Sequence, residues 1–166
     1  MENPMMKIRV EKVTVNVGMG DNIQKVENAK KLIERITERK VVITRSKRRS
    51  TFGVTRGRPI GVKVVMRGEH AMKFLKRTLE TVEKLKASQF DAQGNFSFGI
   101  PEYIDIPGVK YDPSIGIMGL EVTVTVERPG YGVARRRLKS KVGKKHVITK
   151  EQAVEWAKQT LGVPVE

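Results

Sequence analysis

The chain has 166 residues, with 33 Lys and Arg against 18 Asp and Glu, which gives a formal net charge of +15. Such self-repulsion is most simply offset by a polyanionic partner, and nucleic acid is favoured over an anionic membrane surface. Cysteine is absent, which excludes disulfides, thiolate zinc sites and cysteine nucleophiles. Only two histidines occur, far apart in the sequence, so neither a histidine metal site nor a histidine catalytic pair is expected.

The length and a hydrophobic fraction of 39% predict one compact domain, with residues 1–126 as its core and 127–166 as a basic extension. No apolar run approaches the length that spans a bilayer, and the first ten residues lack the apolar core of a signal peptide. We therefore expect a cytoplasmic protein.

Residues 7–17 predict a strand, because Val13, Val15 and Val17 alternate with polar residues. Val10 is in the opposite phase, which predicts a β-bulge. The following G-x-G at 18–20 lacks the third glycine of a nucleotide-binding loop. A tight turn is favoured there, with Asp21 or Asn22 capping the next helix.

Two amphipathic helices are predicted, over residues 23–40 and 68–86, because apolar residues recur at helical spacing within 26–36 and 72–82. Opposite each apolar face lie Lys and Glu. Both helices are therefore expected to pack on a sheet.

Between these helices, residues 41–67 predict a long basic hairpin that contains no acidic residue. Its two strands are apolar or alternate apolar with polar residues. The connection between them carries several arginines, which a core cannot bury, and its Gly and Pro residues exclude a helix. The arginine fork suits bidentate phosphate contacts, and Phe52 offers a stacking surface, so a phosphate backbone is the favoured partner. A solvated charge run on a mobile loop is the alternative.

Residues 87–119 form a long segment rich in turn residues and aromatics, which in a compact domain is usually functional. We predict it to be irregular. Phe98 and Ile104 fit a core plug equally well, whereas Asn95 and Phe96 favour a functional role.

Residues 120–126 alternate cleanly and predict a strand that closes the sheet. A second acid-free cationic segment follows at 128–150, and the sequence leaves open whether it docks on RNA or on protein. Thr149 and Gln152 predict a capping box that opens a short helix ending near Leu161.

Short motifs follow one another in order: VEKV at 10–13, NVG at 16–18, ITRS at 43–46, RPIGVK at 58–63, FD at 90–91, GNF at 94–96, YDP at 111–113 and GL at 119–120. Their succession resembles the large-subunit ribosomal protein five family over nearly the whole chain. The tail from RPGY at 128–131 to ITKE at 148–151 is similar to the archaeal and eukaryotic version, which implies an archaeal source.

This resemblance implies an α+β fold with a curved, mainly antiparallel sheet covered on one face by helices, a long basic hairpin loop and a basic extension ending in a short helix. It further implies a structural role in the large ribosomal subunit, without catalysis or cofactor. The implied partners are 5S ribosomal RNA and large-subunit ribosomal RNA in the central protuberance, P-site transfer RNA at the basic hairpin, and small-subunit protein thirteen across an intersubunit bridge.

The candidate residues for ribosomal RNA are Asn16, Gly18, Thr44, Arg45, Lys63, Arg67, Asn95 and Phe96. The candidates for transfer RNA are Lys47, Arg48, Arg49, Phe52, Arg56 and Arg58, although the tip at 47–51 is more cationic than the family leads us to expect.

Two other classes of protein are less favoured. A nucleic-acid enzyme or RNA-processing factor would need positioned acids, bases or a metal cluster, yet the basic segments are where acids are missing. A DNA-architectural protein would show basic helical faces or a dimer seam, and neither is visible.

Overall fold

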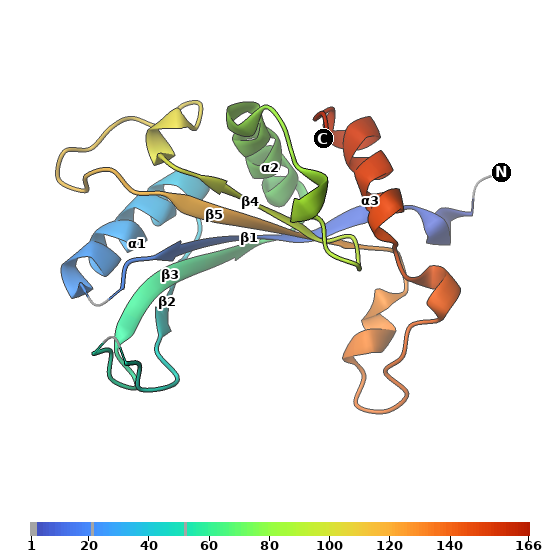
Figure 1. The fold of residues 1–166 in the computed structure, drawn as a ribbon, viewed down its shortest axis with the longest axis horizontal. Coiled ribbons are helices and arrows are strands. Elements are labelled where there is room, and N and C mark those ends of the chain that lie inside the picture. Colours follow the sequence, from blue (N-terminus) through green and yellow to red (C-terminus); the bar gives the residue numbers. More distant parts are fainter. Residues whose placement is uncertain (1–2, 21, 52) are drawn as a thin grey trace.

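The computed structural model describes residues 3–20, 22–51 and 53–166 and has the predicted α+β fold. One antiparallel sheet has the strand order β2-β3-β1-β5-β4, and α1, α2 and α3 lie on the same side of it (Figure 1). The strands are β1 (Arg9–Gly18), β2 (Val42–Arg45), β3 (Pro59–Met66), β4 (Phe96–Ile100) and β5 (Leu120–Glu127), and the helices are α1 (Ile23–Thr37), α2 (Gly68–Val82) and α3 (Lys150–Trp156).

The predicted bulge in β1 is confirmed. Val10 lies opposite Val126, whereas Lys12 lies opposite Thr125, so Glu11 is the additional residue on the bulged strand. Since a bulge interrupts the alternation of faces, Val10 and Val13 both belong to the core side. The phase change in the sequence is thereby explained.

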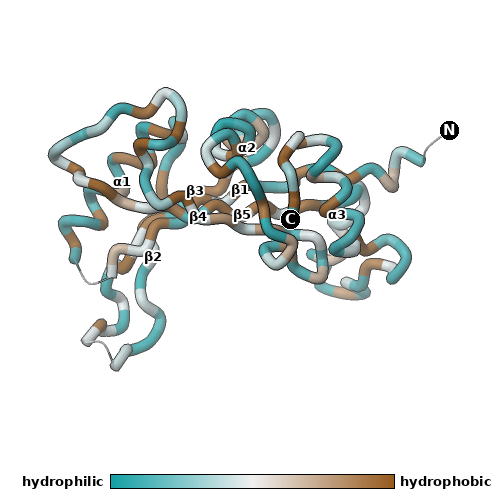
Figure 2. Tube along the Cα trace, turned by 45° about the horizontal axis from the view of Figure 1, so that its top comes forward, coloured by the Kyte–Doolittle hydropathy of each residue, from teal (hydrophilic) through white to brown (hydrophobic). Residues whose placement is uncertain are grey.

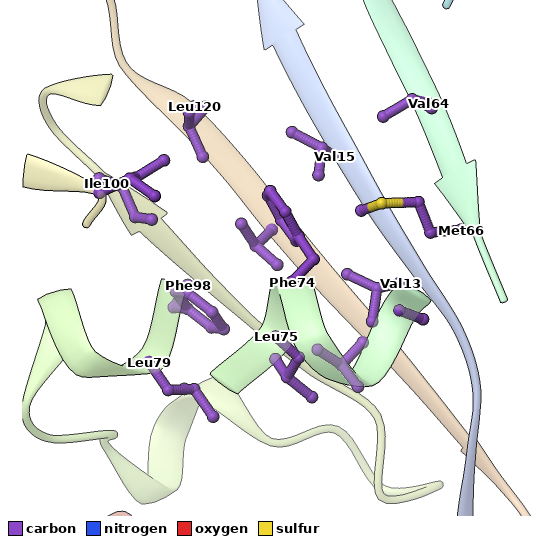
Figure 3. Packing of buried hydrophobic residues seen from close by; sticks show 14 of the residues in the cluster. Val13, Val15, Val64, Met66, Phe74, Leu75, Leu79, Phe98, Ile100 and Leu120 are labelled. Atoms are coloured by element: carbon purple, nitrogen blue, oxygen red, sulfur yellow. The ribbon is translucent and has the colours of Figure 1, made fainter. Parts of the chain in front are cut away.

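The core lies between the sheet and the helices. Figure 3 shows Phe74, Leu75 and Leu79 of α2 packed over Val13 of β1 and Phe98 of β4. The amphipathic pattern of the sequence predicts this face correctly, because the inward side of each strand and helix is apolar.

Both long helices end earlier than predicted. Asn22 caps α1 by accepting a hydrogen bond at Oδ1 from the Lys25 backbone N–H at 3.1 Å, as one of the two predicted caps. At the C-terminal ends, Glu38 and Glu83 have positive φ angles of 52° and 55°. Glu38 has the left-handed conformation, whereas Glu83 has positive φ outside that region. Glycine usually signals a helix end with positive φ, and neither position is glycine, so the sequence did not predict these ends.

The prediction of an irregular segment over 87–119 is wrong in its centre, where β4 pairs with β5. Phe96, Phe98 and Ile100 alternate toward the core, and the Phe96 ring stacks on Phe90 with 4.9 Å between ring centroids. Phe96 is 2% exposed. The prediction that Phe96 stacks on RNA is therefore corrected: its ring is a core group.

The C-terminal extension folds back on the sheet through α3, which begins with the predicted Thr149–Gln152 capping box. Gly94 lies beneath it with φ of +80°, and a Cβ there would meet Ile148 Cγ2 at 2.8 Å and Ala153 Cβ at 2.9 Å. Only glycine fits this approach. Among the described residues, no helix has the length and apolar character needed to cross a membrane.

Candidate nucleic-acid interface

The side of the sheet away from the helices carries a row of residues that crosses all five strands. In register, Val42 lies opposite Lys63, Lys63 opposite Asn16, Asn16 opposite Glu121, and Glu121 opposite Gly99. Asn16 Nδ2 donates to Glu121 Oε2 at 3.4 Å. This side, called the open face below, presents Lys12, Thr14, Asn16, Lys63, Val65, Ser97, Glu121, Thr123 and Thr125.

The centre of the open face is uncharged and, apart from Val65, consists of small polar side chains. Thr14 lies between Val65 and Thr123, and Thr123 lies opposite Ser97. Hydroxyl groups of this kind match the sugar hydroxyls and phosphates that a shallow RNA minor groove displays. The charges that attract a polyanion must therefore lie around this centre.

Four predicted RNA-binding residues are brought together on this side. Thr44 and Gly18 both lie opposite Gly61, two register positions from the pair of Lys63 and Asn16 and therefore on the same side of the sheet. A Cβ on Gly61 would stand 2.4 Å from the Val17 carbonyl oxygen, so the sheet closes here only with glycine.

The basic finger, residues 45–58, extends from β2 and β3 on the side of the open face (Figure 1). Its root is closed by hydrogen bonds from Ser46 N to Arg58 O at 2.9 Å and from Gly57 N to Ser46 O at 2.8 Å. Nearer the tip, Ser50 N donates to Val54 O at 2.9 Å. Figure 2 shows that the finger is mostly hydrophilic, unlike the sheet that carries it.

The predicted transfer-RNA residues follow this loop. Lys47, Arg48, Arg49 and Arg56 are exposed, and Arg58 is half-buried at the root. Phe52 lies outside the described residues. Arg45, one of the ribosomal RNA candidates, donates from Nη1 to the Gly57 carbonyl at 3.3 Å and remains exposed.

An ion-pair network lies at the opposite end of β1. Glu127 accepts from Arg9 at 2.7 Å, and Glu11 accepts from Arg67 at 2.9 Å. Arg135 joins the halves by pairing with Glu11 and, at 3.8 Å, with Glu127. Both carboxylates are nearly buried, with side chains 9% and 12% exposed. Three guanidinium groups thus neutralise two acids.

This network changes one prediction made from the sequence and adds residues that the sequence did not assign to a site. Arg67 was expected to bind RNA, and its guanidinium is already engaged by Glu11, so its first role is to neutralise that carboxylate. Arg135 was predicted only as one cation of the segment 128–150, and Glu127 was not singled out. The one sequence signal was Glu11, a charged residue where the alternation of β1 changes phase.

Asn95 is separated from the open-face group. Its Oδ1 accepts from the Val126 backbone N–H at 3.2 Å, and its Nδ2 donates to Asp91 at 3.2 Å. The amide therefore joins the 91–95 turn to β5. Its role in RNA binding remains a prediction.

The loop between β4 and β5 is held against α1 on the helix side. Arg35 pairs with Asp112 at 3.3 Å, and Asn28 donates to the Ser114 carbonyl at 3.1 Å. Hydrogen bonds from the Ser114 hydroxyl and backbone N–H, followed by Arg35, lower the pKa of Asp112. The ion pair to Arg35 and the hydrogen bond from Asn28 hold this loop away from the open face.

Within the described residues, no group of three His, Asp or Glu side chains is arranged to hold a metal ion. The surface instead combines a neutral polar floor with cationic loops. Such an arrangement can bind phosphates and sugars.

Comparison with known proteins shows the family of the chain. A family model described as ribosomal protein L5 matches residues 3–54, and the model for the C-terminus of the same ribosomal family matches residues 59–156. The large ribosomal subunit protein uL5 of Nanoarchaeum equitans is 53% identical over 99% of both chains. Those of Sulfurisphaera tokodaii and Methanococcoides burtonii are 48% and 47% identical, over 98% and 100% of this chain and 94% and 100% of theirs. The chain belongs to the uL5 family of large-subunit ribosomal proteins, in its archaeal type.

Proposed function

We propose that this chain is a structural constituent of the large ribosomal subunit that binds 5S ribosomal RNA through the open face. The observation that carries the proposal is the cross-strand row from Val42 to Gly99, with Lys63, Asn16 and Glu121 at its centre, on a side of the sheet that is free of helices and lies between cationic segments. Its core and extension, residues 1–126 and 127–166, act as one domain. Membership of a family of ribosomal proteins, which is not an enzyme family, agrees with this role.

We assign the basic finger to a different partner, P-site transfer RNA. Phosphate contacts carry no fixed sequence information, so they suit an RNA that arrives and leaves. Contact with large-subunit ribosomal RNA and a bridge to small-subunit protein thirteen complete the proposal. These partners rest on the family resemblance.

The binding experiment measures affinity for purified 5S ribosomal RNA as a function of salt. Each phosphate neutralised should contribute about 0.7 to 0.9 to the slope of log affinity against log salt concentration, so several contacts give a steep decline. Duplex DNA of equal length serves as competitor and should fail to displace the RNA at moderate salt. Absence of 5S binding, or a slope near zero, would contradict the proposal.

The finger is tested by replacing Arg48, Arg49 and Arg56 together with Ala. Affinity for 5S ribosomal RNA should stay within about threefold, a change of less than ~1 kcal/mol. Occupancy of the P site by transfer RNA on ribosomes assembled with the variant should fall. A variant that loses 5S ribosomal RNA but supports normal transfer RNA occupancy would reverse the assignment.

A further inference from the structure

The segment 136–145, called the C-terminal arm, is a second basic loop whose partner the proposed function leaves open. All of its Lys and Arg side chains are exposed, and for none of them is an ion pair found within the described residues. No acidic residue occurs from 128 to 150. The cations of the arm are Arg136, Arg137, Lys139, Lys141, Lys144 and Lys145.

The two ends of the arm are held together by a network of hydrogen bonds. The Tyr131 hydroxyl donates to the His146 carbonyl at 3.2 Å and accepts from the Ile148 N–H at 2.8 Å. The His146 ring, through Nε2, lies 2.8 Å from the Pro129 carbonyl. Arg128, which is 4% exposed, donates to the His146 carbonyl at 3.2 Å. These hydrogen bonds therefore fix the positions of the residues that flank the arm on both sides.

Arg135, at the start of the arm, directs it toward the open face. Its partners Glu11 and Glu127 lie on that side of β1 and β5. Figure 1 shows the arm and the basic finger projecting on the same side of the sheet, opposite α1 and α2. The ten residues of β1 separate them by roughly 30 Å at strand spacing.

The ion-pair network removes the electrostatic repulsion between this end of the open face and the phosphates of an RNA. Glu11 and Glu127 alone would repel phosphates, but Arg9, Arg67 and Arg135 leave the cluster with a net charge of +1. The neutral centre of the open face then continues without an acidic barrier toward the arm.

We infer that the C-terminal arm binds the phosphate backbone of the same RNA that occupies the open face, at a site distinct from the basic finger. This inference rests on the proposed function. RNA is favoured over a protein groove because the arm offers unpaired cations and only one large exposed apolar side chain, Leu138. Arginine and lysine at this density suit phosphates.

The test replaces Arg136, Arg137 and Lys139 together with Gln. The matched control replaces Lys31, Lys73 and Lys76 with Gln, which removes the same charge from exposed positions on α1 and α2. The arm variant should bind 5S ribosomal RNA at least tenfold more weakly, with a salt slope lower by about 2. The control should stay within twofold of the unaltered chain.

A second measurement locates the arm on the RNA. Because the chain has no cysteine, Ser140→Cys offers a single attachment point for a hydroxyl-radical cleavage reagent, and Thr51→Cys offers the same on the finger. Cleavage of 5S ribosomal RNA is expected from Ser140→Cys and little or none from Thr51→Cys. Tyr131→Phe, which keeps every cation, should speed amide exchange in 136–145 and weaken binding severalfold.

The outcomes separate the two claims. If the unaltered chain binds 5S ribosomal RNA and the arm variant equals it at every salt concentration, the inference is overturned and the proposed function stands. If the unaltered chain does not bind, the proposed function fails. If the arm variant loses only binding to phosphatidylglycerol vesicles, the arm is a membrane contact and the inference is wrong.

Discussion

Phe96→Ala is expected to lower the free energy of unfolding by about 3 to 5 kcal/mol, the range for deleting a buried aromatic side chain. The ring is 2% exposed and stacks between Phe90 and Phe98, whose centroids lie 4.9 and 6.5 Å away. Against a typical domain stability of about 5 to 15 kcal/mol, this is a large loss. Urea denaturation followed by circular dichroism measures it.

Tyr111→Ala is the matched control, because this aromatic side chain from the same predicted segment is 53% exposed. Its effect should stay within about 0.5 kcal/mol. RNA binding by Phe96→Ala should decline only as far as the folded fraction declines. If Phe96→Ala keeps full stability but loses RNA affinity, Phe96 contacts RNA directly and its assignment to the core is wrong.

Arg128→Met should destabilise the C-terminal extension by about 2 to 4 kcal/mol, because three part-buried hydrogen bonds from a charged donor are lost while the side-chain volume is largely kept. Arg128 donates to Met6 O at 3.0 Å, His146 O at 3.2 Å and Gln152 Oε1 at 3.0 Å. One guanidinium thus joins the N-terminal segment to both halves of the extension. Hydrogen exchange should accelerate in α3 and around His146.

Two further variants sharpen this experiment. Arg128→Lys keeps the charge but lacks the planar fork, so an intermediate effect is expected. Arg136→Met, at an exposed position of the arm, should leave exchange unchanged. Wild-type protection of α3 in Arg128→Met would show that the three hydrogen bonds do not hold the extension.

Periodicity was enough to predict the architecture. The alternation of Val13, Val15 and Val17, and its change of phase at Val10, predicted both β1 and its bulge. Helix ends were less predictable, because Glu38 and Glu83 adopt positive φ angles without the glycine that usually announces them. Tertiary packing determines where such helices end, and the local periodicity of apolar residues carries no information about that packing.

The sequence predicted the residues of the candidate site that share a face of neighbouring strands. It did not predict contacts between segments that are far apart in the chain. Asn16 and Lys63 were identified and do lie side by side. Phe96 was assigned to the surface because an aromatic beside Gly94 suits a binding loop as well as a buried strand. Glu11 and Arg135 are separated by 124 positions, so no spacing rule could pair them.

The short outer strands of the sheet have a consequence for the chain before it meets RNA. β2 has four residues and ends at Arg45, while β4 has five and is followed by Pro101. A charged residue at an edge and a proline that lacks an N–H both discourage the addition of a further strand. Edges of this kind offer a second copy of the chain little template for strand addition, so self-association through the sheet is disfavoured before RNA is bound.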